Sequence, residues 1–326
     1  MMSFSSIPVV DVSRGPRAAA EDLGRAAREV GFMYIAGSGI DPRIFEDLLA
    51  VTRRFFALPM DEKMRVWIGH SANHRGYVPE GEEVFAGGTA DRKEAFDLAL
   101  DLPATEGPLL GPNQWPGLPG FREAVTAYYD AVLAFGHRLF EGLALALGEE
   151  PGFFAPHLTR PPSQLRLIHY PHDATAEDRP GIGAHTDYEC FTLLRPTAPG
   201  LEVQSAAAEW IDVPPLPDTF VLNIGDMLEL WTNGEFVATT HRVRTVKQER
   251  YSFPLFFSVD YETKVTPMAG FQRPGAPPRA ALVAGEHLFA QTAQSFTYLR
   301  DRIAAGELAL PDGSVALSSF GHPGQS

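Results

Sequence analysis

The sequence predicts a mainly β fold with added α-helices, arranged as an antiparallel sandwich or barrel. Between residues 164 and 259, short runs of Val, Ile, Leu, Phe and Thr alternate with Gly, Pro and Asn, a pattern typical of such sheets. Before them, residues 120–148 repeat apolar side chains at three- and four-residue steps, which predicts a long helix with one buried face. We therefore expect helices packed around a β-core.

Two helices and two short strands are expected near the start of the chain. The first helix is rich in Ala and begins at Pro16, which suits a first helical turn, and Gly31 suits its end. The second helix ends before Pro59, because proline cannot continue a helix. The expected strands are 7–12 and 32–35, and the expected helices are 16–30 and 42–57.

The rest of the chain is expected to be irregular first and then rich in strands. Residues 67–120 contain many Gly and Pro, so we expect little regular structure there. A last helix is expected at 286–305. The strands expected between these regions are 164–170, 184–194, 201–204, 209–213, 219–230, 241–246 and 250–259.

The length of 326 residues would allow about two domains of ~150 residues each. We find no internal repeat and no low-complexity linker, so we expect one structural unit in three parts. These are an N-terminal helical and irregular region (1–120), the β-core with its long supporting helix (121–265), and a C-terminal tail and helix that pack on the core (266–326).

Composition and charge exclude several classes of function. With 27 Lys and Arg against 41 Asp and Glu, the net charge is −14, which argues against nucleic acid as a partner. No apolar run reaches the roughly 18 residues that a membrane helix needs, so no membrane partner is expected. The first six residues do not resemble a secretory signal, and the single cysteine fits a reducing compartment, so we expect a cytoplasmic protein.

The single cysteine, Cys190, also excludes a disulfide framework and a Cys-rich metal site. Any metal must therefore be held by His, Asp or Glu. His185 and Asp187 lie two residues apart in an expected strand, so their side chains should share one face. Together they would supply two ligands of a 2-His-1-carboxylate site for ferrous iron. Taken alone, the pair also fits a surface strand with a polar face.

Two further pieces follow downstream. His241 begins an expected strand and would supply the third ligand. Arg250 and Ser252 are again two apart on a strand, where a guanidinium and a hydroxyl could together hold the far carboxylate of a dicarboxylate. Each piece is common by chance, but all three in this order are rare, and we take them as one functional site.

These residues resemble the isopenicillin N synthase-like family of Fe(II)/2-oxoglutarate-dependent oxygenases, and the resemblance covers nearly the whole chain. His185-Thr186-Asp187 is similar to the family's His-x-Asp motif, and Arg250-Tyr251-Ser252 to its Arg-x-Ser motif. The other matching segments are Ile7-Pro8-Val9-Val10-Asp11, Gly31-Phe32-Met33-Tyr34-Ile35, Leu165-Arg166-Leu167-Ile168-His169-Tyr170-Pro171, Val221-Leu222-Asn223-Ile224-Gly225-Asp226, Asn233-Gly234 and His241-Arg242-Val243.

The resemblance implies a double-stranded β-helix (jelly-roll) core and an enzyme that oxidises a small molecule with O2, releasing succinate and CO2. It implies Fe(II) ligation by His185, Asp187 and His241. The co-substrate 2-oxoglutarate would be held by Arg250, Ser252 and Tyr170. Hydroxylation, desaturation and cyclisation all remain open as outcomes.

One departure and several weaker assignments go with the resemblance. Ile168 and His169 stand where the family has Asn and Tyr, and we expect His169 to be structural because it faces away from Tyr170. We expect His70 and His74 to be surface residues. The residues proposed for the substrate pocket, from the regions that contact substrates in the family, are Arg75, Tyr77, Phe96, Phe191, Trp231, Phe257 and Tyr261.

Two alternatives remain open at the level of the sequence. An oxidase like isopenicillin N synthase shares the metal ligands and Arg-x-Ser but uses no 2-oxoglutarate. A jelly-roll protein that only binds ligands is the other. The sequence predicts neither the substrate nor the oligomeric state.

Overall fold

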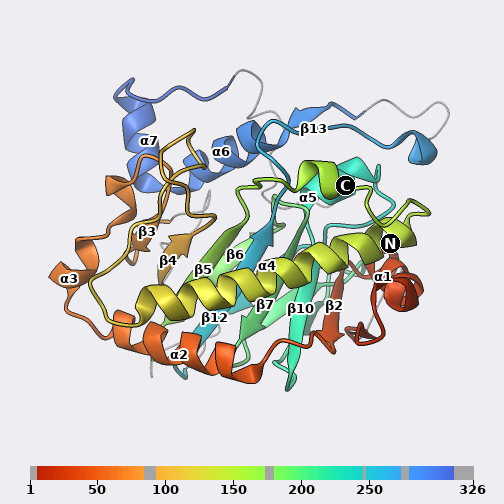
Figure 1. The fold of residues 1–326 in the computed structure, drawn as a ribbon, viewed down its shortest axis with the longest axis horizontal. Helices are drawn as coiled ribbons and strands as arrows, with labels where there is room; N and C mark the ends of the chain where they lie inside the picture. The colour runs from red at the N-terminus through yellow and green to blue at the C-terminus, as the bar shows by residue number, and fades with distance from the viewer. Residues whose placement is uncertain (1–5, 84–92, 173–179, 245–246, 273–278, 312–326) are drawn as a thin grey trace.

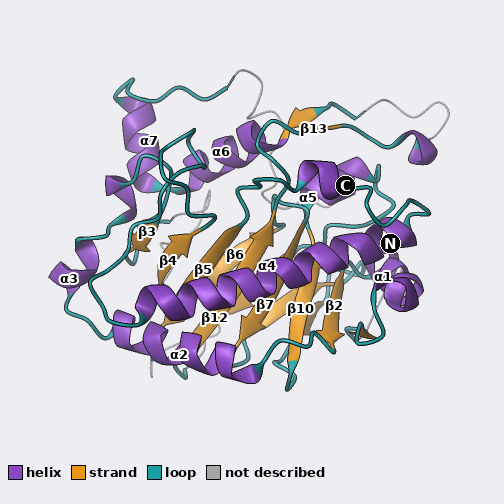
Figure 2. Ribbon diagram, in the orientation of Figure 1, coloured by secondary structure: helices purple, strands orange, loops and turns teal. Residues whose placement is uncertain are grey.

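The structure is a computed structural model that describes residues 6–83, 93–172, 180–244, 247–272 and 279–311. Two β-sheets form the core and helices cover it (Figures 1 and 2). The mainly β fold with packed helices that the sequence predicts is confirmed. None of the helices in the described ranges is long and apolar enough to cross a membrane.

The larger sheet has eight strands. β1 and β2 run parallel, and the remaining described pairs in this sheet are antiparallel. In spatial order the strands are β1 (Val9–Asp11), β2 (Phe32–Ala36), β10 (Thr219–Ile224), β7 (Phe191–Pro196), β12 (Arg250–Phe257), β5 (Gln164–Tyr170), β4 (Glu94–Leu98) and β3 (Gly76–Val78).

The smaller sheet has four antiparallel strands, and a separate two-stranded ribbon lies near the C-terminus. The four strands are, in spatial order, β6 (Pro180–His185), β11 (His241–Arg244), β8 (Leu201–Gln204) and β9 (Trp210–Asp212). The ribbon is β13 (Lys264–Val265) with β14 (Leu282–Val283).

The long helix α4 (Phe121–Ala146) crosses one face of the larger sheet, with α2 (Pro42–Phe56) beside it (Figure 1). Its apolar stripe is buried as the sequence predicts, with Val125, Val132 and Leu143 fully enclosed. The remaining helices are α1 (Pro16–Glu29), α3 (Met60–Met64), α5 (Asp226–Trp231), α6 (Ala284–Ser295) and α7 (Thr297–Ala304).

Four expected elements were wrong in detail. The expected strand 184–194 is two strands joined by a loop, because β6 ends at His185 and β7 begins at Phe191. The expected strand 219–230 ends at Ile224, after which the chain enters α5. The expected helix 286–305 is interrupted at Phe296, whose backbone is extended. Within 67–120 the chain forms β3 and β4, because β5 offers β4 a partner edge that no local pattern reveals.

The contact between α4 and the larger sheet depends on Gly136. A Cβ atom at this position would lie 2.0 Å from the ring of Phe257 on β12. That ring is fully buried and stacks on Phe191, with ring centroids 4.7 Å apart, so it has no room to retreat. Only a glycine allows the helix to lie this close to the sheet.

Gly136→Ala is therefore expected to lower the free energy of unfolding by about 1–3 kcal/mol, the usual cost of overpacking a core. In an exposed helix the same change would stabilise by about 1 kcal/mol, so the sign is diagnostic. Denaturant unfolding measures it. Ala134→Val, at an exposed position of the same helix, serves as the control and should lower stability by no more than about 0.7 kcal/mol, the helix-propensity cost of a β-branched residue. A stabilised Gly136→Ala would contradict the packing described.

Candidate metal centre

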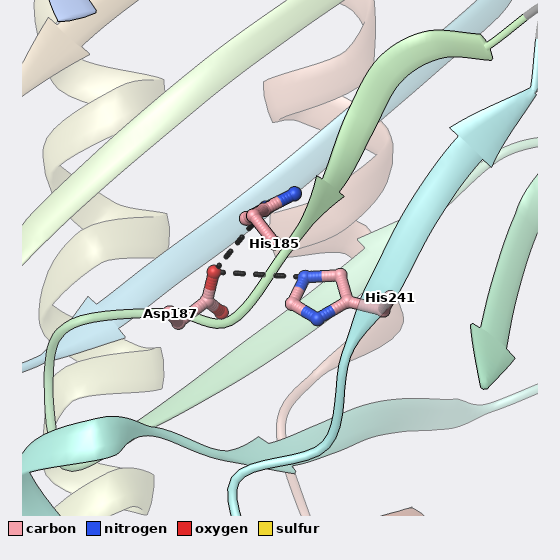
Figure 3. Close-up of side chains that lie close together, drawn as sticks. All are labelled: His185, Asp187 and His241. Atoms are coloured by element: carbon pink, nitrogen blue, oxygen red, sulfur yellow. Dashed lines mark ion pairs between the residues drawn. The ribbon is translucent and has the colours of Figure 1, made fainter. Parts of the chain in front are cut away.

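Three side chains converge where β6 and β11 pair. His185 is the last residue of β6 and His241 the first of β11, and the two are direct partners in the register. Asp187 follows two residues after His185, and its Oδ1 lies 3.7 Å from His185 Nε2 and 3.6 Å from His241 Nε2 (Figure 3). One ligand atom from each residue lies within 4.8 Å of the others. The structure thus brings together the three residues expected to bind iron.

Asp187 reaches this position by a different route from the one that the sequence suggested. It does not lie in a strand with His185, so alternation along a strand does not explain the shared direction. Instead the loop after β6 is tied to the start of α5, where the backbone N–H of Asp226 donates to the carbonyl of Asp187 at 2.8 Å. Gly225 permits this approach, because a Cβ there would lie 2.2 Å from the carbonyl oxygen of Glu189.

The Asp187 carboxylate is also held in orientation. Thr192 on β7 and Asn223 on β10 both donate to its Oδ2, the amide of Asn223 at 2.7 Å. Oδ1 is the oxygen left facing the two imidazoles. Hydrogen bonds of this kind fix the direction and basicity of a metal-binding carboxylate.

Backbone carbonyls fix the two imidazoles in a matching way. Since a carbonyl can only accept, the Nδ1–H of His185 donates to Gly183 at 2.8 Å, and that of His241 to Thr239 at 3.3 Å. Both rings then present an unprotonated Nε2 toward Asp187. This is the tautomer that a metal ion requires.

The electrostatics of the three residues suit a cation. Burial and the neighbouring imidazole of His241 lower the pKa of His185 to about 4, so the ring is neutral at pH 7. Burial alone would raise the pKa of Asp187, but the imidazoles of His241 and His185 and the hydrogen bonds from Thr192 and Asn223 outweigh it and lower the pKa. Two His side chains with one carboxylate are the donor set of non-haem iron sites.

The three residues line a cavity between the two sheets, and Arg250, Ser252 and Tyr170 line it too. Arg250 is the register partner of Tyr170 across β12 and β5, and its guanidinium lies 4.8 Å from the centre of the Tyr170 ring. Its Nε donates to the carbonyl of Ala198 at 3.1 Å. Nη1 and Nη2 are buried and have no hydrogen-bond partner among the described residues. A planar fork left without partners in a cavity suits a carboxylate, so the residues fit 2-oxoglutarate.

The departure from the family pattern takes a definite form. Ile168 lines the cavity beside Ser252, its register partner, so an apolar group replaces the amide there. His169 faces away, as expected, and its two ring nitrogens lie 2.8 Å from Glu94 Oε1 and 3.0 Å from Glu249 Oε1. Its place between two carboxylates, away from the cavity lining, supports the structural role that the sequence suggested.

The seven residues proposed for the substrate pocket are not among the described residues that line this cavity. Arg75 is buried and donates to the backbone carbonyls of Asn73, His74 and Leu109. The hydroxyl of Tyr77 donates to Glu94 at 2.6 Å. The other five lie in aromatic packing or against helices: Phe96 on Phe55 and Phe121, Phe191 and Phe257 on each other and on Phe140, Trp231 on Phe154, and Tyr261 at Gly285.

Sequence reasoning missed several residues that do line the cavity. His74 was expected at the surface, but it is 3% exposed, lines the cavity and bonds through Nδ1 to the Tyr298 hydroxyl at 2.7 Å; His70 is exposed as expected. Glu83, Lys93 and Arg166 are also in the lining. For Arg166 a signal existed, since it shares the face of β5 that carries Ile168 and Tyr170. For Glu83 and Lys93, no local sequence pattern could have revealed that they line the cavity.

Comparison with known proteins decides the family. Residues 7–118 match the family described as non-haem dioxygenase in morphine synthesis N-terminal, and residues 161–259 match the 2OG-Fe(II) oxygenase superfamily. The chain is 38% identical over 247 residues to 2-oxoglutarate-dependent dioxygenase caaD of Aspergillus niger, covering 73% of this chain and 77% of that protein. It is 33% identical over 328 residues to a homoarginine-6-hydroxylase of Glycine max, covering 91% and 99%. The chain belongs to the Fe(II)/2-oxoglutarate oxygenase family.

Solved structures agree with this placement. A Neurospora crassa enzyme solved with alpha-KG and thymine superimposes with a TM-score of 0.76 at 25% identity, covering 92% of this chain and 97% of that one. A putative 2OG-Fe(II) oxygenase family protein of Caulobacter crescentus gives a TM-score of 0.79 at 28% identity, covering 93% and 100%. The jelly-roll core and the resemblance to the isopenicillin N synthase-like oxygenases are thereby confirmed. This oxygenase is a 2-oxoglutarate-dependent dioxygenase that uses Fe(II).

Asn223→Ala tests whether the orientation of Asp187 matters to the oxygenase. Loss of the 2.7 Å bond to Oδ2 frees the carboxylate to rotate, and we expect Fe(II) affinity to fall about 10- to 100-fold. Competition against a chelating dye without oxygen measures it. Asn113→Ala, in a loop outside the cavity lining, is the matched control. Equal affinity in the Asn223 variant and the wild type would show that Thr192 alone suffices to orient Asp187.

Proposed function

We propose that this dioxygenase binds Fe(II) through His185 Nε2, His241 Nε2 and Asp187 Oδ1, and 2-oxoglutarate through Arg250, Ser252 and Tyr170. The observation that carries the proposal is the pair of buried Arg250 Nη atoms, for which the described residues offer no hydrogen-bond partner, in the same cavity as the three candidate ligands. A buried guanidinium without an anion is costly, so its retention there argues for an anionic ligand.

In this proposal each residue has a defined task. The three ligands leave coordination positions open for 2-oxoglutarate and O2. Bound iron supplies the redox chemistry in which O2 and 2-oxoglutarate yield succinate and CO2 while one oxygen atom is used on the substrate. Arg250 forks onto the far carboxylate of 2-oxoglutarate, and the Ser252 and Tyr170 hydroxyls add to that contact. The walls keep bulk water away from the reacting atoms.

The substrate is proposed to be a small molecule. Relatives carry names that point to different compounds, homoarginine for the Glycine max protein and clavatol for a Penicillium crustosum oxidase that is 33% identical. The Neurospora enzyme was solved with thymine. We propose hydroxylation as the outcome, because the homoarginine relatives are named hydroxylases and match over 90% or more of this chain.

Three further assignments belong to the same proposal. The chain acts as one unit made of 1–120, 121–265 and 266–326, since residues of all three parts line the cavity. Its place is a reducing compartment such as the cytoplasm, which suits ferrous iron and the single buried Cys190. Nucleic acid and membranes are not proposed as partners, given the net charge of −14.

Mixing the protein with Fe(II) and 2-oxoglutarate without oxygen should give a visible charge-transfer band. His241→Ala should abolish the band, because one of three metal ligands is lost, while His70→Ala at an exposed position should keep it. A wild-type protein without the band would contradict the proposed site.

Arg250→Ala should keep Fe(II) binding but lower the affinity for 2-oxoglutarate by at least about 10- to 100-fold, since charged hydrogen bonds contribute about 1.5–3 kcal/mol each. Arg250→Lys should recover part of this, because the charge returns without the fork. Titrating the band with 2-oxoglutarate measures both. Product formed with Fe(II) and O2 but without 2-oxoglutarate would favour an oxidase in which Arg250 holds a carboxylate of the substrate.

A further inference from the structure

A second polar cluster lines the cavity at a distance from Arg250. Arg166 on β5 directs Nε and Nη2 onto Asp97 Oδ1 and Oδ2, both at 2.8 Å, and Nη1 onto Glu83 at 3.0 and 3.1 Å. The Lys93 ammonium lies 2.9 Å from Glu83 Oε2. These four side chains, here called the buried charge cluster, are each exposed by no more than 10%.

The cluster and the proposed 2-oxoglutarate anchor lie at opposite ends of one strand. Arg166, Ile168 and Tyr170 share the cavity face of β5, and four residues of strand span about 13 Å. Tyr170 pairs with Arg250 at one end, and Arg166 pairs with Asp97 at the other. A substrate held by the cluster would therefore extend toward the proposed iron site without competing with 2-oxoglutarate for Arg250.

The cluster also lies near the candidate iron ligands. Lys93, Glu83 and His185 all line the same cavity. A compound of modest length can reach both.

The C-terminal segment closes this end of the cavity. The extended residue Phe296, between α6 and α7, forms a β-bridge with Glu83, and its ring lies 5.4 Å from the Arg166 guanidinium. The backbone N–H of Tyr298 donates to Glu82 Oε1 at 2.8 Å. Burial by this segment strengthens every ionic contact that the cluster makes.

The charges on the cluster add up to zero. Burial would raise the pKa of Glu83, but Arg166 and Lys93 outweigh it and hold the pKa well below its usual range, so Glu83 is an anion. Burial raises the pKa of Asp97 in spite of Arg166, but the two parallel hydrogen bonds that Arg166 donates to its oxygens favour the carboxylate. Two cations thus meet two anions.

The cluster keeps binding capacity toward the cavity. Arg166 has five N–H groups, and its contacts with Asp97 and Glu83 number four, which leaves one N–H group for a ligand. Glu83, Lys93 and Arg166 line the cavity, whereas Asp97 is fully buried. Buried ion pairs are poor stabilisers compared with apolar packing. A purely structural role would therefore explain neither the cost of burying these four charged side chains nor their position at the cavity.

We infer that the buried charge cluster is the substrate-recognition site and that it binds the α-amino and α-carboxylate groups of a free amino acid. Arg166 and Lys93 contact the carboxylate, and Glu83 contacts the ammonium. A zwitterion adds no net charge to a neutral cluster, whereas a simple acid or amine would leave one charge uncompensated in a buried place. The amino acid side chain then points toward the proposed iron site. The inference rests on the proposed function and names its substrate class.

The test uses the full chain with Fe(II) and 2-oxoglutarate under anaerobic conditions. Calorimetry measures binding of the standard L-amino acids and L-homoarginine, and oxygenated assays measure substrate-stimulated succinate release. At least one free amino acid should bind. Its Nα-acetyl derivative and its methyl ester should each bind about 10-fold or more weakly, since each loses a charged contact.

Variants locate the contacts. Glu83→Gln should weaken binding of the free amino acid but should not further weaken binding of its Nα-acetyl derivative, which already lacks the ammonium. Lys93→Met should weaken binding of the free amino acid but should not further weaken binding of its methyl ester, which already lacks the carboxylate. Both should keep the charge-transfer band, which shows that they fold and hold 2-oxoglutarate. Glu202→Gln, paired with Arg242 in the smaller sheet and outside the cavity lining, is the matched control.

Two results overturn the inference while leaving the proposed function intact. One is a normal band with no amino acid bound at millimolar concentration. The other is binding that is indifferent to acetylation and to Glu83→Gln, in which case the cluster is structural or takes a simple acid. Absence of the band in the wild type is a different result, because it removes the proposed function itself.

Discussion

The site depends on the fixed orientation of one carboxylate. Asp187 lies in a loop, yet Thr192 and Asn223 hold its Oδ2, and Asp226 holds its backbone. Thr192 and Asn223 belong to the larger sheet, whereas His185 and His241 end two paired strands of the smaller one. Asp187 therefore contacts residues of both sheets. A metal ion bound to it and to the two histidines would link the larger sheet to the smaller one.

The cavity around Asp187 combines two kinds of polar group with different requirements. Arg250 has buried Nη atoms that find no hydrogen-bond partner in the described parts of the chain, which favours an external anion. Arg166 is already paired with Asp97 and Glu83, so it needs no external anion. In the inference above, it binds a ligand that leaves the net charge of the cluster at zero. Arg250 and Arg166 both face the cavity from the paired strands β12 and β5. The length of β5 between Arg166 and Tyr170 therefore separates the proposed substrate end of the cavity from its co-substrate end.

The sequence predicted the parts of the site that short motifs encode. His185, Asp187, His241 and Arg250 were identified in advance, and the structure places them in one cavity. The reason given for Asp187 was wrong, because β6 ends at His185 and the loop folds back through contacts with residues 225–227 that alternation does not describe. The switch from β10 into α5 that creates those contacts falls inside residues 219–230, for which the sequence pattern predicted a single strand.

The substrate end could not be predicted because it depends on pairs that are far apart in the chain. Arg166 meets Glu83 across 83 residues and Asp97 across 69. Aromatic residues such as Phe96 and Phe257 were chosen by type, but the face on which a side chain lies depends on sheet register, and that register placed both in the core. Ion pairs between distant segments leave no periodic signal.

The most direct test of the central claim is a crystal structure obtained without oxygen in the presence of Fe(II) and 2-oxoglutarate, with the metal located by its anomalous scattering. We predict one metal ion about 2.0–2.2 Å from His185 Nε2, His241 Nε2 and Asp187 Oδ1, with the far carboxylate of 2-oxoglutarate on the Arg250 fork. A metal bound through Asp187 Oδ2, or a 2-oxoglutarate carboxylate that lies on Arg166 in place of Arg250, would contradict it.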